Sequence, residues 1–242
     1  RLPLLARLQV AHPDAELRGL QFAFDRAARC AHRVVHSIFG QPAPAALEIA
    51  FADRSTLGIS VDARMPHYVE FVSRSLHGGY RPLETLLLDA MLPQTRVFLD
   101  VGAQWGYFTW LALTNPGFKG QVYSFEQTPA LVGELERIRD GGRFNDVHVM
   151  PYGLADYDGA AAQDSSRSRT SLSVKRLDDL DVPPPDLIRI GTPGLERAML
   201  EGASATIRAH LPAIMFGSLN PLSEDAPILF DLLRDNGYQF HL

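Results

Sequence analysis

The residues best suited to chemistry lie in a short stretch near the middle of the chain, "FLDVGAQWGYF" (98–108). An acid, Asp100, stands inside an apolar run, and Gly102 and Gly106 follow it. Glycine has no Cβ, so a ligand can approach the backbone of such a turn. A helix that begins near Tyr107 would offer free N–H groups to an anionic group. Ligands of open parallel sheets bind beyond the carboxyl ends of the strands, so the stretch predicts a small-molecule site.

Three kinds of ligand can be weighed against this turn. A nucleoside triphosphate requires GxxxxGK[ST], and no lysine follows Gly106. A dinucleotide requires GxGxxG, but Gln104 and Tyr107 stand where glycines would be needed. S-adenosylmethionine (SAM) instead needs acceptors for its ammonium and ribose, which Asp100 and Glu126 of "VYSFEQ" suit. Such charge-assisted hydrogen bonds contribute about 1.5–3 kcal/mol each. The alternative is that the glycines only allow tight packing of a strand against a helix.

Strands and helices alternate from Arg96 onward. This rhythm predicts parallel pairing and a doubly wound α/β sheet covered on both faces. Residues 156–185 interrupt it with Ala, Ser, Arg and Asp, and we expect a lid or a disordered connection there. The expected strands are Val97–Val101, Gln121–Phe125, Val147–Met150, Leu187–Ile190, Ala213–Phe216 and Tyr238–Leu242, and the expected helices 109–113, 129–139, 196–210 and 228–235.

The first 78 residues form a predicted extension to a main domain of residues 79–242. Apolar spacing predicts a helix over Ala15–Phe39 with arginines on its other side. We expect this helix to pack on its own domain or to meet a partner domain or a second copy. A hairpin over Ala46–Val61, turning at residues 53–55, and a helix over 68–76 complete the extension, and a helix over 84–91 begins the main domain.

Composition excludes several classes of protein. The formal net charge of −5 argues against a generic nucleic-acid binder. No run approaches 18 apolar residues, so we expect no transmembrane segment. The single cysteine, Cys30, cannot form an internal disulfide, and without a visible signal peptide we expect a cytoplasmic protein. The chain begins at Arg1 rather than Met, so we expect that it can be part of a longer protein. Histidine and acid spacings predict no metal site.

Several segments together resemble the FkbM family of class I SAM-dependent methyltransferases. In chain order they are "GGYRPLETLLLDAMLP", "VFLDVGAQWGYFT", "GQVYSFEQTP", "HVMPYGLADYDG", "RLDDL", "PDLIRIGTPGLERAMLEGASATI", "PAIMFGSL" and "LLRDNGYQF". They cover roughly Tyr68 to Leu242. The resemblance implies a Rossmann-like, mostly parallel sheet, SAM as cofactor, and O-methylation of a hydroxyl on a glycan or natural-product-like acceptor.

The resemblance also implies roles for individual residues. Glu126 would hold the ribose, Gln127 would lie beside the adenine, and Tyr80 and Glu84 would cover the cofactor. The methionine half of SAM would be surrounded by Gly102, Ala103, Gly106, Tyr107 and Phe108, and the adenine flanked by Asp146, Tyr152 and Gly153.

The chain departs from the family on the side where an acceptor would dock. The family segment "LIKIDVEGAE" reads "LIRIGTPGLE" here, so Gly191 replaces an aspartate and Pro193 a glutamate. Gly217 stands where the fifth strand usually ends in a glutamate. A general base adds roughly 10²–10⁴-fold to a rate, so its loss slows an enzyme more than it abolishes activity.

Two explanations compete for these departures. In the first, the acceptor site is rebuilt and the chain remains a methyltransferase. In the second, the domain is catalytically impaired and binds SAM or a protein partner within a larger polypeptide. No catalytic residue can be assigned: His67 and His77 flank the segment before the first strand, but surface or packing roles are favoured, as is capping for His210.

Overall fold

The chain divides into two compact units, residues 1–89 and 90–242. The predicted division into residues 1–78 and 79–242 stays a prediction. The predicted helix over Ala15–Phe39, the hairpin turn at 53–55 and His77 lie outside the described residues. The computed structural model describes residues 7–10, 44–50, 56–62, 65, 67–68, 70–71, 80–161, 172–217 and 225–239.

The first unit contains an antiparallel sheet in the order β1-β2-β3. Its strands are β1 (Arg7–Val10), β2 (Pro44–Ala50) and β3 (Thr56–Asp62). The pairing of β2 with β3 confirms the predicted hairpin. Helix α4 (Pro82–Met91) confirms the helix predicted over 84–91, and it begins earlier because proline suits the first helical turn.

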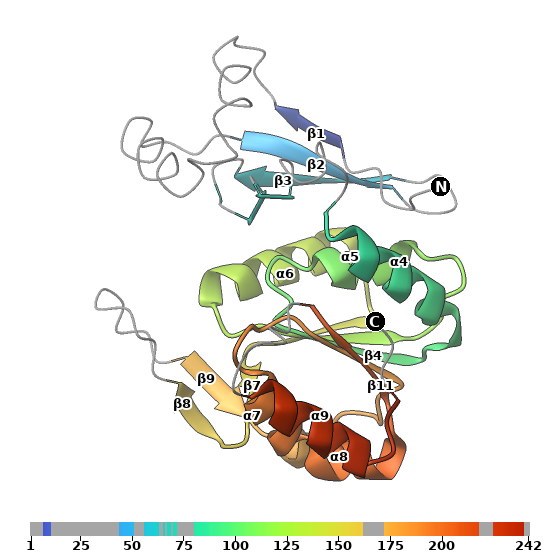
Figure 1. Ribbon diagram of the computed structural model, residues 1–242. Helices are drawn as coiled ribbons and strands as arrows, with labels where there is room; N and C mark the ends of the chain where they lie inside the picture. The colour runs from blue at the N-terminus through green and yellow to red at the C-terminus, as the bar shows by residue number, and fades with distance from the viewer. Residues whose placement is uncertain are drawn as a thin grey trace. The chain divides into compact units, whose positions relative to one another are not determined.

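The second unit is built on a five-stranded parallel sheet in the order β11-β10-β4-β5-β6. Helices α5 and α6 lie on one face of the sheet, and α7, α8 and α9 on the other (Figure 1). The predicted Rossmann-like, doubly wound fold is therefore confirmed. The strands are β4 (Val97–Val101), β5 (Gln121–Phe125), β6 (Val147–Met150), β10 (Leu187–Ile190) and β11 (Ala213–Phe216), all at their predicted residues. The helices are α5 (Tyr107–Thr114), α6 (Pro129–Gly142), α7 (Glu196–Gly202), α8 (Ser204–His210) and α9 (Ala226–Asp235).

Burial on both faces explains the short apolar strands. Four of the five residues in β4 and in β5 are buried, and all four in β10. Helix α5 is apolar on nearly every side, and seven of its eight residues are buried, as expected of a helix inside a core. One core cluster joins the strands to α7, α8 and α9 through residues such as Leu99, Met199 and Leu229.

The expectation of a disordered connection over 156–185 was wrong for its described part, and the alternative, a lid, stays a prediction. Strands β8 (Gly159–Ala161) and β9 (Leu172–Lys175) pair with each other, and β9 pairs with β7 (Gly153–Leu154). A short 3₁₀ helix, η2 (Leu177–Asp179), follows. Val174 and Leu177 are only 4% and 1% exposed, so burial of a few apolar side chains organises a polar segment.

Two smaller expectations also differ from the structure. The single helix predicted over 196–210 is divided at Ala203 into α7 and α8. The closing strand predicted over 238–242 is not seen at residues 238 and 239, and 240–242 lie outside the described part. Another 3₁₀ helix, η1 (Leu92–Gln94), leads into β4.

Asp178 of the "RLDDL" segment joins η2 to the start of α8. Its carboxylate accepts hydrogen bonds from the backbone N–H groups of Ala205 and Thr206 and from the Thr206 hydroxyl, each at 2.8 Å. Partial burial alone would raise the pKa of this carboxyl, but these hydrogen bonds and the nearby charge of Arg176 hold the pKa below its ordinary value. Asp178 therefore stabilises the fold by satisfying the free N–H groups of a helix.

Replacement of this cap should destabilise the fold. We expect Asp178→Ala to lower the free energy of unfolding by about 1–2 kcal/mol, whereas Asp179→Ala, its exposed neighbour, should change it by less than about 0.5 kcal/mol. Since the folded pKa lies below the unfolded value of about 4, the stabilisation is present above that value and is lost as the pH falls through the folded pKa. Urea unfolding from pH 3 to 7 measures both effects. Equal losses in the two variants would contradict the cap.

Candidate functional site

The loop after β4 is shaped by residues in the left-handed region of backbone conformation. The φ angles are +72° at Gly102, +55° at Gln104 and +91° at Gly106. A Cβ at Gly106 would lie 2.6 Å from both Cδ2 of Leu135 and Nε1 of Trp110, so only glycine fits there. The loop thus runs tightly into the first turn of α5.

Glu126 holds this loop from the end of the neighbouring strand. Its side chain follows β5, and the residue is only 6% exposed. One carboxylate oxygen accepts the N–H of Gln104 at 2.9 Å, and the other accepts the N–H of Thr128 at 2.8 Å. Each oxygen of a carboxylate can accept a further hydrogen bond. Glu126 therefore links the glycine loop to the start of α6 and retains acceptor capacity.

Asp100 lies beneath the loop in a buried polar cluster. Its carboxylate accepts from Nη1 of Arg189 on β10 and from the Thr109 hydroxyl on α5, both at 2.9 Å. The Thr109 hydroxyl also bonds to that of Ser124 on β5 at 2.7 Å. The guanidinium of Arg189 stacks on the Phe108 ring at 4.0 Å. Asp100 is fully buried and ion-paired, so its predicted contact with the SAM ammonium stays a prediction.

Three residues expected around the adenine lie beyond β5 and β6. A Cβ at Gly153 would lie 2.9 Å from Oε1 of Gln127, so these two residues are in close contact. Among the described residues, no donor reaches that buried Oε1. Tyr152 packs on Phe125, with 6.0 Å between ring centroids, and Lys175 lies over its ring at 4.6 Å. Gln127 thus presents a buried acceptor that no described residue satisfies, next to Gly153.

Other predicted residues are distributed differently. Ala103, Tyr107 and Phe108 are 6%, 7% and 3% exposed, within the loop and the first turn of α5. Tyr80 and Glu84 belong to the first unit, where Arg81 pairs with Glu84 at 2.8 Å, so their part in the site stays a prediction.

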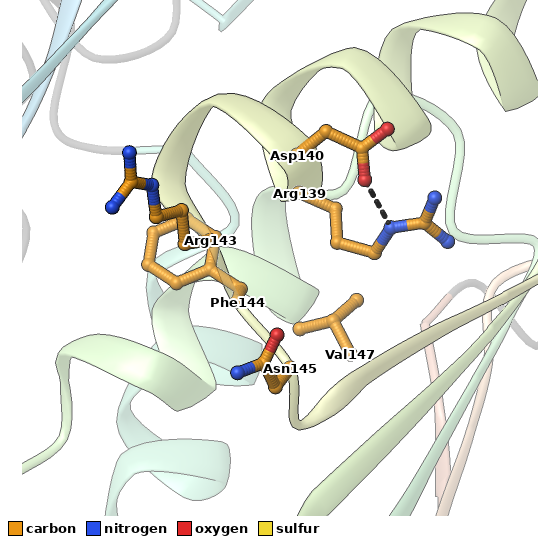
Figure 2. A pocket seen from close by; sticks show the side chains of 6 residues that line it. All are labelled: Arg139, Asp140, Arg143, Phe144, Asn145 and Val147. Carbon is orange, nitrogen blue, oxygen red and sulfur yellow. Dashed lines mark hydrogen bonds and ion pairs between the residues drawn. The ribbon is translucent and has the colours of Figure 1, made fainter.

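Asp146 precedes β6 and is exposed. In a parallel sheet this is the amino edge, opposite the glycine loop, so the structure does not bring Asp146 to that loop. A cavity of about 480 Å³ lies at the same edge, lined by residues of the α6–β6 turn (Figure 2). The lining residues are Arg139, Asp140, Arg143, Phe144, Asn145 and Val147.

Gly191 and Gly217 follow the carboxyl ends of β10 and β11. Gly191 donates its N–H to the Val101 carbonyl at 2.8 Å, and Gly217 donates to the Ile190 carbonyl at 2.9 Å. These two hydrogen bonds extend the parallel ladder one residue beyond the ends of β10 and β11. Pro193 follows in the turn before α7.

Two features are absent from the described part of the chain. No cluster of three His, Cys, Asp or Glu residues there suits a metal ion. No helix there is both long and apolar enough to cross a bilayer.

Sequence reasoning missed four residues of this site. Ser124 and Arg189 are polar residues within apolar strands, and that signal could have identified them. Thr109 gave no such signal. Thr192 was also missed, although its Cγ2 would be 2.5 Å from a Cβ at Gly102.

Comparison with solved structures gives several methyltransferases of low similarity. The methyltransferase FkbM from Methylobacillus flagellatus KT is 21% identical, with a TM-score of 0.43 over 50% of this chain and 32% of that protein. This chain thus spans about a third of that protein's length. A precorrin-6y C5,15-methyltransferase from Geobacter metallireducens GS-15 is 20% identical, with a TM-score of 0.39 over 64% of this chain and 70% of that one. A ribosomal protein L11 methylase from Lactobacillus delbrueckii subsp. bulgaricus is 15% identical, with a TM-score of 0.43 over 66% and 71%.

No curated protein gives a significant match. The family description "Methyltransferase FkbM domain" matches residues 100–240, which is more than half of the chain and includes the glycine loop, Glu126 and the β10 rim. This chain therefore belongs to the FkbM family of methyltransferases.

Proposed function

We propose that this chain binds SAM at the glycine loop and transfers its methyl group to a hydroxyl oxygen of a glycan or natural-product-like acceptor. The observation that carries the proposal is the buried Glu126 carboxylate, which holds the loop through Gln104 and can still accept bonds from a ribose diol. The lone cysteine, Cys30, accords with a cytoplasmic setting.

The residues around the loop fit the cofactor. Helix α5 begins directly after the glycine loop, and the N–H groups at the start of a helix suit an anionic group such as the carboxylate of the methionine half. Tyr107 and Phe108 stand at this turn. The buried, unsatisfied Oε1 of Gln127 suits the amino group of an adenine, and Tyr152 lies in the adjacent segment. SAM would supply an electrophilic methyl group; the protein would bind and orient it.

Orientation is the main contribution that this chain would make to the reaction. Methyl transfer is an in-line displacement, for which positioning of the two reactants is a large part of catalysis. Gly191, Pro193 and Gly217 provide no carboxylate to take the acceptor's proton. We therefore expect acceptors whose hydroxyl is acidic or loses its proton to solvent.

The same rim supports a second candidate, a domain that binds SAM or a protein partner without catalysis. The two candidates differ in one product. Incubation with SAM and a broad panel of glycans and natural products, followed by detection of S-adenosylhomocysteine, separates them. Turnover of any acceptor excludes the second candidate, and SAM binding with no turnover across the panel favours it.

The cofactor assignment predicts the effect of changing Glu126. Glu126→Gln removes the charge and turns one acceptor into a donor that faces an N–H group, so SAM affinity should fall roughly 10- to 150-fold. Isothermal titration calorimetry measures this change, with thermal unfolding as a check on folding. Asp140→Asn, at the opposite edge of the sheet, should leave the affinity unchanged. Absence of SAM binding to the parent protein at millimolar ligand would exclude the cofactor.

The loop geometry predicts that Gly106 cannot be replaced. Gly106→Ala would place a side chain at a φ of +91° and within 2.6 Å of Leu135 and Trp110. We expect the free energy of unfolding to fall by roughly 1–3 kcal/mol, with weaker SAM binding. Gly141→Ala is the matched control, because a Cβ there meets nothing within 4 Å and Gly141 lies in α6. Equal unfolding midpoints for the two variants in urea would argue against this account of the loop.

A further inference from the structure

We propose that Gly191 and Arg189 form a coupled pair: the absence of a side chain at Gly191 admits the guanidinium of Arg189 to Asp100, and this pair positions the glycine loop. Gly191 and Arg189 are positioning residues, not catalytic ones.

The first observation is the space that a side chain at Gly191 would need. A Cβ there would lie 2.4 Å from Nη1, 2.8 Å from Nη2 and 2.9 Å from Cζ of Arg189. Real Cβ atoms do not approach other atoms so closely. Gly191 is not among the described residues with positive φ, so its backbone alone would accept any residue. A side chain at position 191 would therefore clash with the guanidinium of Arg189 as it lies in this structure.

The second observation is that the guanidinium cannot easily move aside. Arg189 is 4% exposed, and its Nη1 donates to the fully buried Asp100 at 2.9 Å. The Cζ atom of its guanidinium lies 4.0 Å from the centroid of the Phe108 ring. Arg189 and Asp100 are direct partners in the pairing of β10 with β4. Separating a buried ion pair leaves an uncompensated charge, so a side chain at Gly191 should disturb more than one rotamer.

The third observation links this pair to the glycine loop. Gly191 donates its N–H to the carbonyl of Val101, the residue before Gly102. A Cβ at Gly102 would in turn lie 2.5 Å from Cγ2 of Thr192 and 3.2 Å from the carbonyl carbon of Gly191. The ends of β4 and β10 are thus interlocked through two glycines. Displacement of Gly191 has to shift the start of the loop.

The clash depends on the shape of the arginine side chain itself. A lysine ammonium lacks the two branches, Nη1 and Nη2, that fill the space beside Gly191. Arginine at position 189 is therefore incompatible with a side chain at position 191.

A double-mutant cycle tests the coupling in the full chain. Gly191→Ala should lower the melting temperature by roughly 5–10 °C, as expected for disturbing a buried ion pair. In the Arg189→Lys background, the same substitution should shift it by less than about 2 °C, because the clash is gone. Gly133→Ala on α6, where a Cβ meets nothing within 4 Å, is the control for glycine replacement itself.

SAM affinity is the second measurement. If Gly191 and Arg189 had a purely structural role, SAM affinity would not change together with the melting temperature. This readout rests on the proposed function, whereas the melting temperature does not. The dissociation constant for SAM is measured by calorimetry below the melting temperatures of the variants. It should rise about tenfold in Gly191→Ala. In the double variant Arg189→Lys/Gly191→Ala it should return to the value of Arg189→Lys alone. Additive melting shifts would overturn the proposal, as would insolubility of Gly191→Ala in both backgrounds. Coupled melting shifts with an unchanged dissociation constant would overturn the positioning role alone.

Discussion

The ion pair between Asp100 and Arg189 is the interaction on which the arrangement of the second unit depends. Both side chains are almost completely removed from water, and transfer of such charges from water is unfavourable unless partners are held in place. The Thr109 hydroxyl and the Phe108 ring supply those partners from α5. The pair therefore joins β4, β10 and α5 at one point, directly beneath the glycine loop.

The loop above this pair is enclosed by close contacts from several elements. Thr192 fills the space beside Gly102, while Leu135 and Trp110 fill that beside Gly106. Glu126 joins the loop from β5. The half of the site that we assign to SAM is thus rigidly built. At the carboxyl ends of β10 and β11, the backbone ladder continues through Gly191 and Gly217.

Much of the fold could be predicted because its signals are local. An apolar run such as Leu187–Ile190, closed by glycine, marks a buried strand whatever its neighbours are, and all five strands of the parallel sheet were located in this way. The insertion was predicted wrongly because its order comes from distant contacts. β9 pairs with β7 across residues whose composition is typical of a loop, and Asp178 finds its partners 27 and 28 residues away.

The fold class and the strands of the parallel sheet could be predicted from the sequence alone, because apolar periodicity depends only on neighbouring residues, and the family was predicted from the resemblance of several segments. Tertiary structure decided how the charges are used. Asp100 and Arg189 are 89 positions apart, and only the register of β4 with β10 makes them a pair. The same register brings the guanidinium into the space at Gly191. Glycine at position 191 was visible in the sequence, but the side chain that fills the space beside it was not, because contacts between strands leave no local pattern.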